Sequence, residues 1–139
     1  MTAARRRLLM ANGVFLVVVG GIQVVFELLA YYAGTGPYGY IFEESPYAIG
    51  WVEAHGLAFI IGVLLLTVAA RDLRRFWHVT AAAVHTLLGT ANLVFWDSFA
   101  VFGLVPMGIA ATVVHFVLVA AHIGAFVVSR QPAVGDSVR

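Results

Sequence analysis

The chain has 139 residues, of which 62% are hydrophobic and only 11% are charged. Soluble domains carry about 25% charged residues, so this composition indicates a membrane-embedded protein. The chain contains no cysteine, which excludes disulfide frameworks, thiol catalysis and thiolate metal sites.

Four apolar segments follow one another along the chain, and each has roughly the 20 residues that span a bilayer as a helix. The pair Ser45-Pro46 is typical of an N-cap followed by proline at the first helical position, so the second helix is expected to begin before Trp51. We expect one domain over residues 1–130 and a disordered cytoplasmic tail over residues 131–139. The four helices are expected at about residues 8–33, 51–70, 76–96 and 104–128.

Arginine supplies every basic side chain, and its distribution predicts the orientation in the membrane. The arginines lie before the first segment, between the second and third, and after the fourth, whereas the other two loops contain none. By the positive-inside rule both termini then face the cytoplasm. The composition favours a multi-pass protein of the bacterial cytoplasmic (inner) membrane. The arginines are Arg5, Arg6, Arg7, Arg71, Arg74, Arg75, Arg130 and Arg139.

Polar and small residues recur every seven residues in all four segments. Seven residues are two helical turns, so each set lies on one helix face, and such a repeat is the seam of a left-handed bundle. We therefore predict an all-α integral membrane protein, an antiparallel left-handed bundle of four transmembrane helices. The sets are Gly13, Gly20 and Glu27; His55, Gly62 and Ala69; His78, His85 and Asn92; and Gly108, His115 and His122.

When the segments are folded back on one another, these sets predict three layers at different depths. The alignment is expected to hold to within about one helical turn. The outer layer contains Glu27, His55, Asn92 and Gly108, the middle layer Gly20, Gly62, His85 and His115, and the inner layer Gly13, Ala69, His78 and His122.

Two interpretations compete for the middle layer. In the structural one, polar side chains hydrogen-bond between helices, worth roughly 0.6–2 kcal/mol each, and glycine permits close packing. In the other, His85 and His115 are the axial ligands of a haem b. Gly20 and Gly62 then leave room for the porphyrin. Seven residues are only about 10 Å of helix rise, so at most one haem fits.

The residues of the outer layer indicate a different chemistry. Glu27 and His55 are candidate ligands of a divalent metal such as Zn, Fe or Mn. With Asn92 they are also candidate catalytic residues, acting as general acid and base on a lipid-soluble substrate. The alternative is a structural Glu–His pair, since a buried carboxylate needs a partner.

The histidines of the third and fourth segments allow one more role. Imidazoles that share a helix face inside a membrane can carry protons. The sequence does not separate such a relay from interhelical hydrogen bonding. The residues concerned are His78, His85, His115 and His122.

The glycine-patterned first segment (GVFLVVVGGIQVVFE), the extended outer loop and the small-residue second segment (EAHGLAFIIGVLLL) resemble the DoxX-like group of small bacterial four-helix membrane proteins. The resemblance covers most of the chain. It implies the four-helix fold, but the group's functions are varied and no motif carries over the role of an individual residue.

The leading expectation is a small polytopic inner-membrane protein that serves as an accessory subunit of a membrane complex. Its expected contacts are the lipid bilayer and a membrane-protein partner or further copies of itself, with no nucleic acid. One alternative is a single-haem or metal-binding redox protein. Another is a membrane enzyme that acts through Glu27 and His55, so the sequence leaves open whether the protein is an enzyme.

Overall fold

A computed structural model describes residues 2–71 and 74–128, and every regular element in that part of the chain is a helix. The prediction of an all-α protein is confirmed. The predicted tail over residues 131–139 lies outside the described residues. The helices are α1 (Thr2–Ala33), α2 (Gly39–Phe42), α3 (Ala48–Arg71), α4 (Phe76–Val94), α5 (Trp96–Val101) and α6 (Val105–Val128).

The predicted helices are present, with shifted ends. The first begins earlier than predicted and includes the arginine cluster, because α1 starts at Thr2. As the Ser45-Pro46 signal predicts, the second begins before Trp51, at Ala48. The third ends at Val94, and the separate short helix α5 follows it.

Three of the described helices, α1, α3 and α6, are long and apolar enough to cross a membrane. The 19-residue α4 is not among them. It carries two histidines, an asparagine and three threonines among its residues. The chain is thus a helical protein with membrane-spanning capacity, and its four-span bundle stays a prediction.

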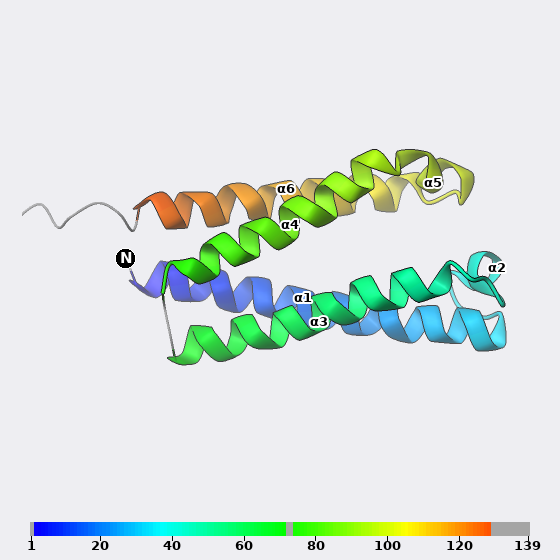
Figure 1. Ribbon diagram of the computed structural model, residues 1–139, viewed down its shortest axis with the longest axis horizontal. Coiled ribbons are helices and arrows are strands. Elements are labelled where there is room, and N and C mark those ends of the chain that lie inside the picture. Colours follow the sequence, from blue (N-terminus) through cyan, green and yellow to red (C-terminus); the bar gives the residue numbers. More distant parts are fainter. Residues whose placement is uncertain (1, 72–73, 129–139) are drawn as a thin grey trace, which may run out of the picture. The chain divides into compact units, whose positions relative to one another are not determined.

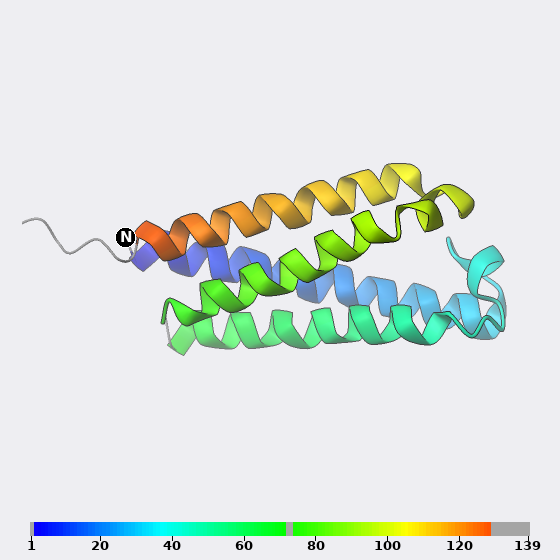
Figure 2. The ribbon, with the colours of Figure 1, turned by 45° about the horizontal axis from the view of Figure 1, so that its top comes forward.

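The chain divides into two compact units, Leu9–Asp72 and Met1–Leu8 with Leu73–Arg139. In the first unit α1 and α3 run antiparallel, side by side, and α2 lies in their connection (Figure 1). In the second unit α4 and α6 form another antiparallel pair, connected through α5 (Figure 2). Each unit is therefore a helical hairpin.

Glycines bring α1 and α3 into close contact. A Cβ atom at Gly20 would lie 2.7 Å from the carbonyl oxygen of His55 and 2.9 Å from the backbone nitrogen of Phe59. A Cβ atom at Gly62 would lie 2.9 Å from the carbonyl oxygen of Gly13. These separations leave no room for a side chain, so the hairpin depends on glycine there.

These contacts correct the predicted layers within the α1–α3 hairpin. Gly20 lies against the backbone of His55 and Phe59, not against Gly62, and Gly62 lies against Gly13. The seven-residue repeat predicts the helix face and the contact of Glu27 with His55, whereas Gly20 and Gly62 are displaced from one another along the helices.

The connection between α1 and α3 is compact because two glycines allow a tight reversal. Gly34 ends α1 with a positive φ of 59°, and its N–H donates to the carbonyl of Ala30 at 3.0 Å, as in the αL cap. A Cβ atom at Gly39 would lie 2.3 Å from the Gly34 carbonyl oxygen. The reversal buries Tyr38 and Phe42 beside Trp51 at the start of α3.

Candidate functional site

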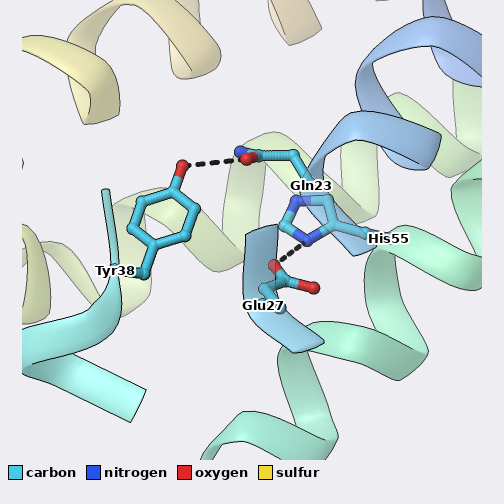
Figure 3. Close-up of polar contacts among 4 residues, drawn as sticks. All are labelled: Gln23, Glu27, Tyr38 and His55. Carbon is cyan, nitrogen blue, oxygen red and sulfur yellow. Dashed lines mark hydrogen bonds and ion pairs between the residues drawn. The ribbon is translucent and has the colours of Figure 1, made fainter. Parts of the chain in front are cut away.

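The predicted partners Glu27 and His55 meet across the α1–α3 hairpin. Figure 3 shows their side chains pointing toward one another from the two helices, and Glu27 Oε1 lies 2.5 Å from His55 Nδ1. The Glu27 side chain is fully buried, whereas the His55 side chain is 25% exposed. A proton between these two atoms makes either an ion pair or a neutral hydrogen bond.

The second oxygen of the Glu27 carboxylate has no such partner. Glu27 Oε2 is buried and has no hydrogen-bond partner among the described residues. Most buried acceptors in proteins have a hydrogen-bond donor. A buried carboxylate oxygen without one, inside an apolar hairpin, makes this a candidate functional site.

Tyr38 and Gln23 form a second polar contact beside the pair. The Tyr38 hydroxyl donates to Gln23 Oε1 at 2.9 Å (Figure 3), and Gln23 lies four residues before Glu27 on the same face of α1. Burial raises the pKa of the Tyr38 phenol above its usual 10.0, which keeps the hydroxyl in its donor form. The sequence does not indicate Tyr38 as a site residue, because the position of Tyr38 depends on the reversal before α2.

Aromatic rings enclose this end of the hairpin. The Trp51 ring lies 6.1 Å from the His55 ring and 5.1 Å from that of Phe42, between centroids. The Tyr38 ring lies 6.4 Å from that of Trp51. The Glu27–His55 pair therefore has an apolar wall on the side of the connection.

The third predicted residue of the outer layer, Asn92, belongs to α4 in the other unit. Its convergence with Glu27 and His55 stays a prediction. Within residues 2–71 and 74–128, no group of three His, Cys, Asp or Glu side chains is placed to hold a metal ion. A metal at Glu27 and His55 would have two of the three protein ligands that catalytic zinc sites use, and this too stays a prediction.

The α4–α6 hairpin pairs its histidines as the predicted inner and middle layers require. His78 Nδ1 lies 2.9 Å from His122 Nδ1, and His85 Nδ1 lies 2.9 Å from His115 Nδ1. Both are hydrogen-bond distances. A neutral pair needs one ring as donor and the other as acceptor through these atoms.

The two pairs are linked to one another by ring stacking. The His85 and His122 rings are stacked, with centroids 6.5 Å apart and planes 11° apart. His78, His85 and His122 are fully buried, while His115 is partly exposed. We call these four residues, in the order His115, His85, His122 and His78, the histidine ladder.

The predicted haem does not fit this arrangement. Two imidazoles on opposite sides of one metal ion have their ligating nitrogens about 4 Å apart, twice a typical metal–nitrogen bond, but His85 and His115 bond directly to each other at 2.9 Å. Gly20 and Gly62, which were expected to border the porphyrin, are in close α1–α3 contacts. A haem would require α4 and α6 to separate, so that role stays a prediction.

Comparison with known proteins finds no relative of this chain, since none of the protein-family models, curated proteins or solved structures matches it. The DoxX-like resemblance therefore stays a prediction.

Proposed function

We propose that this chain is a small polytopic protein of the bacterial inner membrane whose histidine ladder moves protons within the bilayer, as an accessory subunit of a larger membrane complex. The observation that carries the proposal is the ladder itself. Two hydrogen-bonded imidazole pairs stack on one another between α4 and α6. Ionisable side chains inside a membrane are costly and commonly mark proton pathways.

The proposed topology has α4 as a fourth span and both termini in the cytoplasm. Its support is the distribution of arginine, because arginines occur near both termini and in the connection between α3 and α4, as expected for segments on the cytoplasmic side. A partly polar α4 is tolerated as a span when its polar side chains face another helix, as His78 and His85 do toward α6.

The transfer steps follow from the ring contacts. A proton that binds His115 makes it an imidazolium, which gives its Nδ1 proton to His85 Nδ1 across 2.9 Å and returns to the neutral form. For the next step the stacked rings of His85 and His122 turn until a ring nitrogen of each faces the other. The N–H bond on His85 then breaks and an N–H bond on His122 forms. His122 then gives the proton to His78 through the second Nδ1 contact of 2.9 Å. At each step one N–H bond breaks and one forms.

The ladder covers only part of the bilayer. His78 lies near the start of α4, and His85 is seven residues further on, about 10 Å of the roughly 30 Å of hydrocarbon. A path of this length joins one membrane surface to the middle of the membrane. Such a path suits a subunit that supplies or removes protons at a centre held by a partner protein.

Imidazole NMR distinguishes proton transfer from static hydrogen bonding. We would label the histidines with ¹⁵N, reconstitute the protein in lipid bilayers and record the ring nitrogens from about pH 5 to pH 8, where histidine charge changes. We expect the Nδ1 signals of His85 and His115 to be averaged by exchange of the shared proton. His115→Phe should abolish averaging at His85 and preserve it between His78 and His122. Four rings that each keep one fixed neutral tautomer throughout would contradict the proposal.

A further inference from the structure

We infer that the Glu27–His55 pair binds the hydroxyl group of a lipid-soluble alcohol or phenol at the end of the α1–α3 hairpin that carries α2. This site lies in the other unit from the histidine ladder and does not depend on proton transfer there.

The unsatisfied oxygen of Glu27 is the acceptor. Glu27 Oε1 is engaged by His55 Nδ1, while Oε2 is buried with no hydrogen-bond partner among the described residues. A carboxylate accepts hydrogen bonds at both oxygens, and a buried acceptor without a donor is costly. A ligand that brings one hydrogen-bond donor satisfies this atom.

The charge balance of the pair selects a neutral donor. Glu27 Oε1 and His55 Nδ1 lie 2.5 Å apart, and a carboxylate paired with an imidazolium has no net charge. An ammonium group would add an uncompensated charge to an apolar hairpin, and an anion would meet the carboxylate. A hydroxyl group donates its hydrogen and adds no net charge.

The surroundings select a ligand with an apolar body. The Trp51 ring lies beside the His55 ring, and Phe42 packs against Trp51. The His55 side chain is the exposed member of the pair. Leu28, next to Glu27 in the sequence of α1, and Leu57, two residues after His55 in α3, expose apolar side chains. A ligand approaching Glu27 thus arrives from a hydrocarbon environment and leaves its apolar part there.

The test uses the fluorescence of Trp51, which lies next to His55. The chain has three tryptophans, so replacement of Trp77 and Trp96 by Phe leaves Trp51 as the reporter in the full chain. The probe is 2-bromododecan-1-ol, whose bromine quenches fluorescence beside its hydroxyl group. Its matched control is 2-bromododecane, which has the same body and no donor.

We expect the alcohol to quench Trp51 saturably, at a half-saturating mole fraction about tenfold lower than that of 2-bromododecane, since one hydrogen bond to a charged acceptor is worth about that factor. Glu27→Met, which keeps the length of the side chain without its acceptors, should remove the difference. Glu53→Met is the control, because Glu53 is an exposed carboxylate on α3, and it should leave the difference intact.

The comparison of probes in the otherwise native protein decides the proposal even if Glu27→Met does not fold. Equal quenching by the alcohol and by 2-bromododecane would overturn it. Tighter quenching by 2-bromododecylammonium than by the alcohol would also overturn it, because the site would then select a cation. Loss of the preference in Glu53→Met together with its retention in a folded Glu27→Met would assign the binding elsewhere.

Discussion

Glu27 is a buried carboxylate in an apolar hairpin, and the His55 imidazole is in contact with it. Removing one member of such a pair destabilises the protein far more than removing both, because the remaining buried charge then has no partner. The contact between these two side chains therefore links α1 to α3.

His55→Leu should lower the free energy of unfolding by roughly 3–5 kcal/mol, because it leaves the buried Glu27 carboxylate unpaired. The double variant Glu27→Leu with His55→Leu should be clearly more stable than this single variant. Unfolding in detergent, followed by circular dichroism, measures both, with Glu53→Leu at an exposed position as the control. A double variant no more stable than His55→Leu would show that the pair is not coupled in this way.

Tyr38 provides a second prediction at this scale, from its burial. The pKa of its phenol is raised above 10.0, mainly by burial, so the folded protein holds this proton to a higher pH than the unfolded chain does. The stabilising contribution is complete below about pH 10 and is lost as the pH rises through the folded pKa. The difference between the ultraviolet titrations of the native protein and Tyr38→Phe should show one phenol that ionises above 10. Ionisation at or below 10 would disagree.

Whether a site residue can be recognised from the sequence depends on whether it lies in a periodic helix or in a connection. Glu27 and His55 could be paired from the sequence because both belong to long helices with a seven-residue pattern. Tyr38 could not be found, because its contact with Gln23 requires the chain to reverse at Gly34 and Gly39. No periodicity in the sequence encodes that reversal.

At the scale of elements, the distance between α1 and α3 is set by glycines, which have no side chain. Gly20 lies against backbone atoms of α3, which cannot move aside as a flexible side chain can. By contrast, Gly56 on α3 has no atom near the position of a Cβ. The two glycines thus form a matched pair for testing helix contact against helix propensity.

Gly20→Ala should destabilise the protein by about 1–3 kcal/mol, as overpacking of a close contact does. Gly56→Ala should be neutral or stabilising by up to about 1 kcal/mol, because alanine favours the helix. Thermal unfolding of both variants in one detergent provides the comparison. Equal stabilities would show that α1 and α3 do not touch at Gly20.

At the same scale, the predicted depths agree with the structure fully in one hairpin and in part in the other. The His78–His122 and His85–His115 levels were predicted correctly, because α4 and α6 are connected by a short link that contains only α5. In the α1–α3 hairpin Glu27 and His55 meet as predicted, whereas Gly20 lies against His55 and Phe59 and not against Gly62.

For the whole molecule, the number of spanning helices decides which segments share a side of the membrane. Three described helices are long and apolar enough to span, and the proposed topology adds α4. If α4 spans, the connection near Val101 lies opposite the end of α3 at Arg71. If it does not span, the two lie on the same side.

Because the chain has no cysteine, single cysteines report the sides of the membrane cleanly. In intact cells a membrane-impermeant maleimide should label Thr35→Cys and Val101→Cys, and should label Arg71→Cys only after permeabilisation. Both Thr35 and Arg71 are exposed, and Val101 is 78% exposed, so accessibility within the fold does not limit the reaction. Common behaviour of Val101→Cys and Arg71→Cys would rule out α4 as a span.

The repeated spacing of the histidine ladder has a mechanical consequence for α6. Sliding α6 along α4 by any small amount breaks both Nδ1 contacts at once. A slip of seven residues, about 10 Å, restores one contact, with either His78 opposite His115 or His85 opposite His122. The two helices thus have one fully matched register and two half-matched ones. The histidine ladder therefore opposes sliding of α6 along its axis, and it favours these three registers over the positions between them.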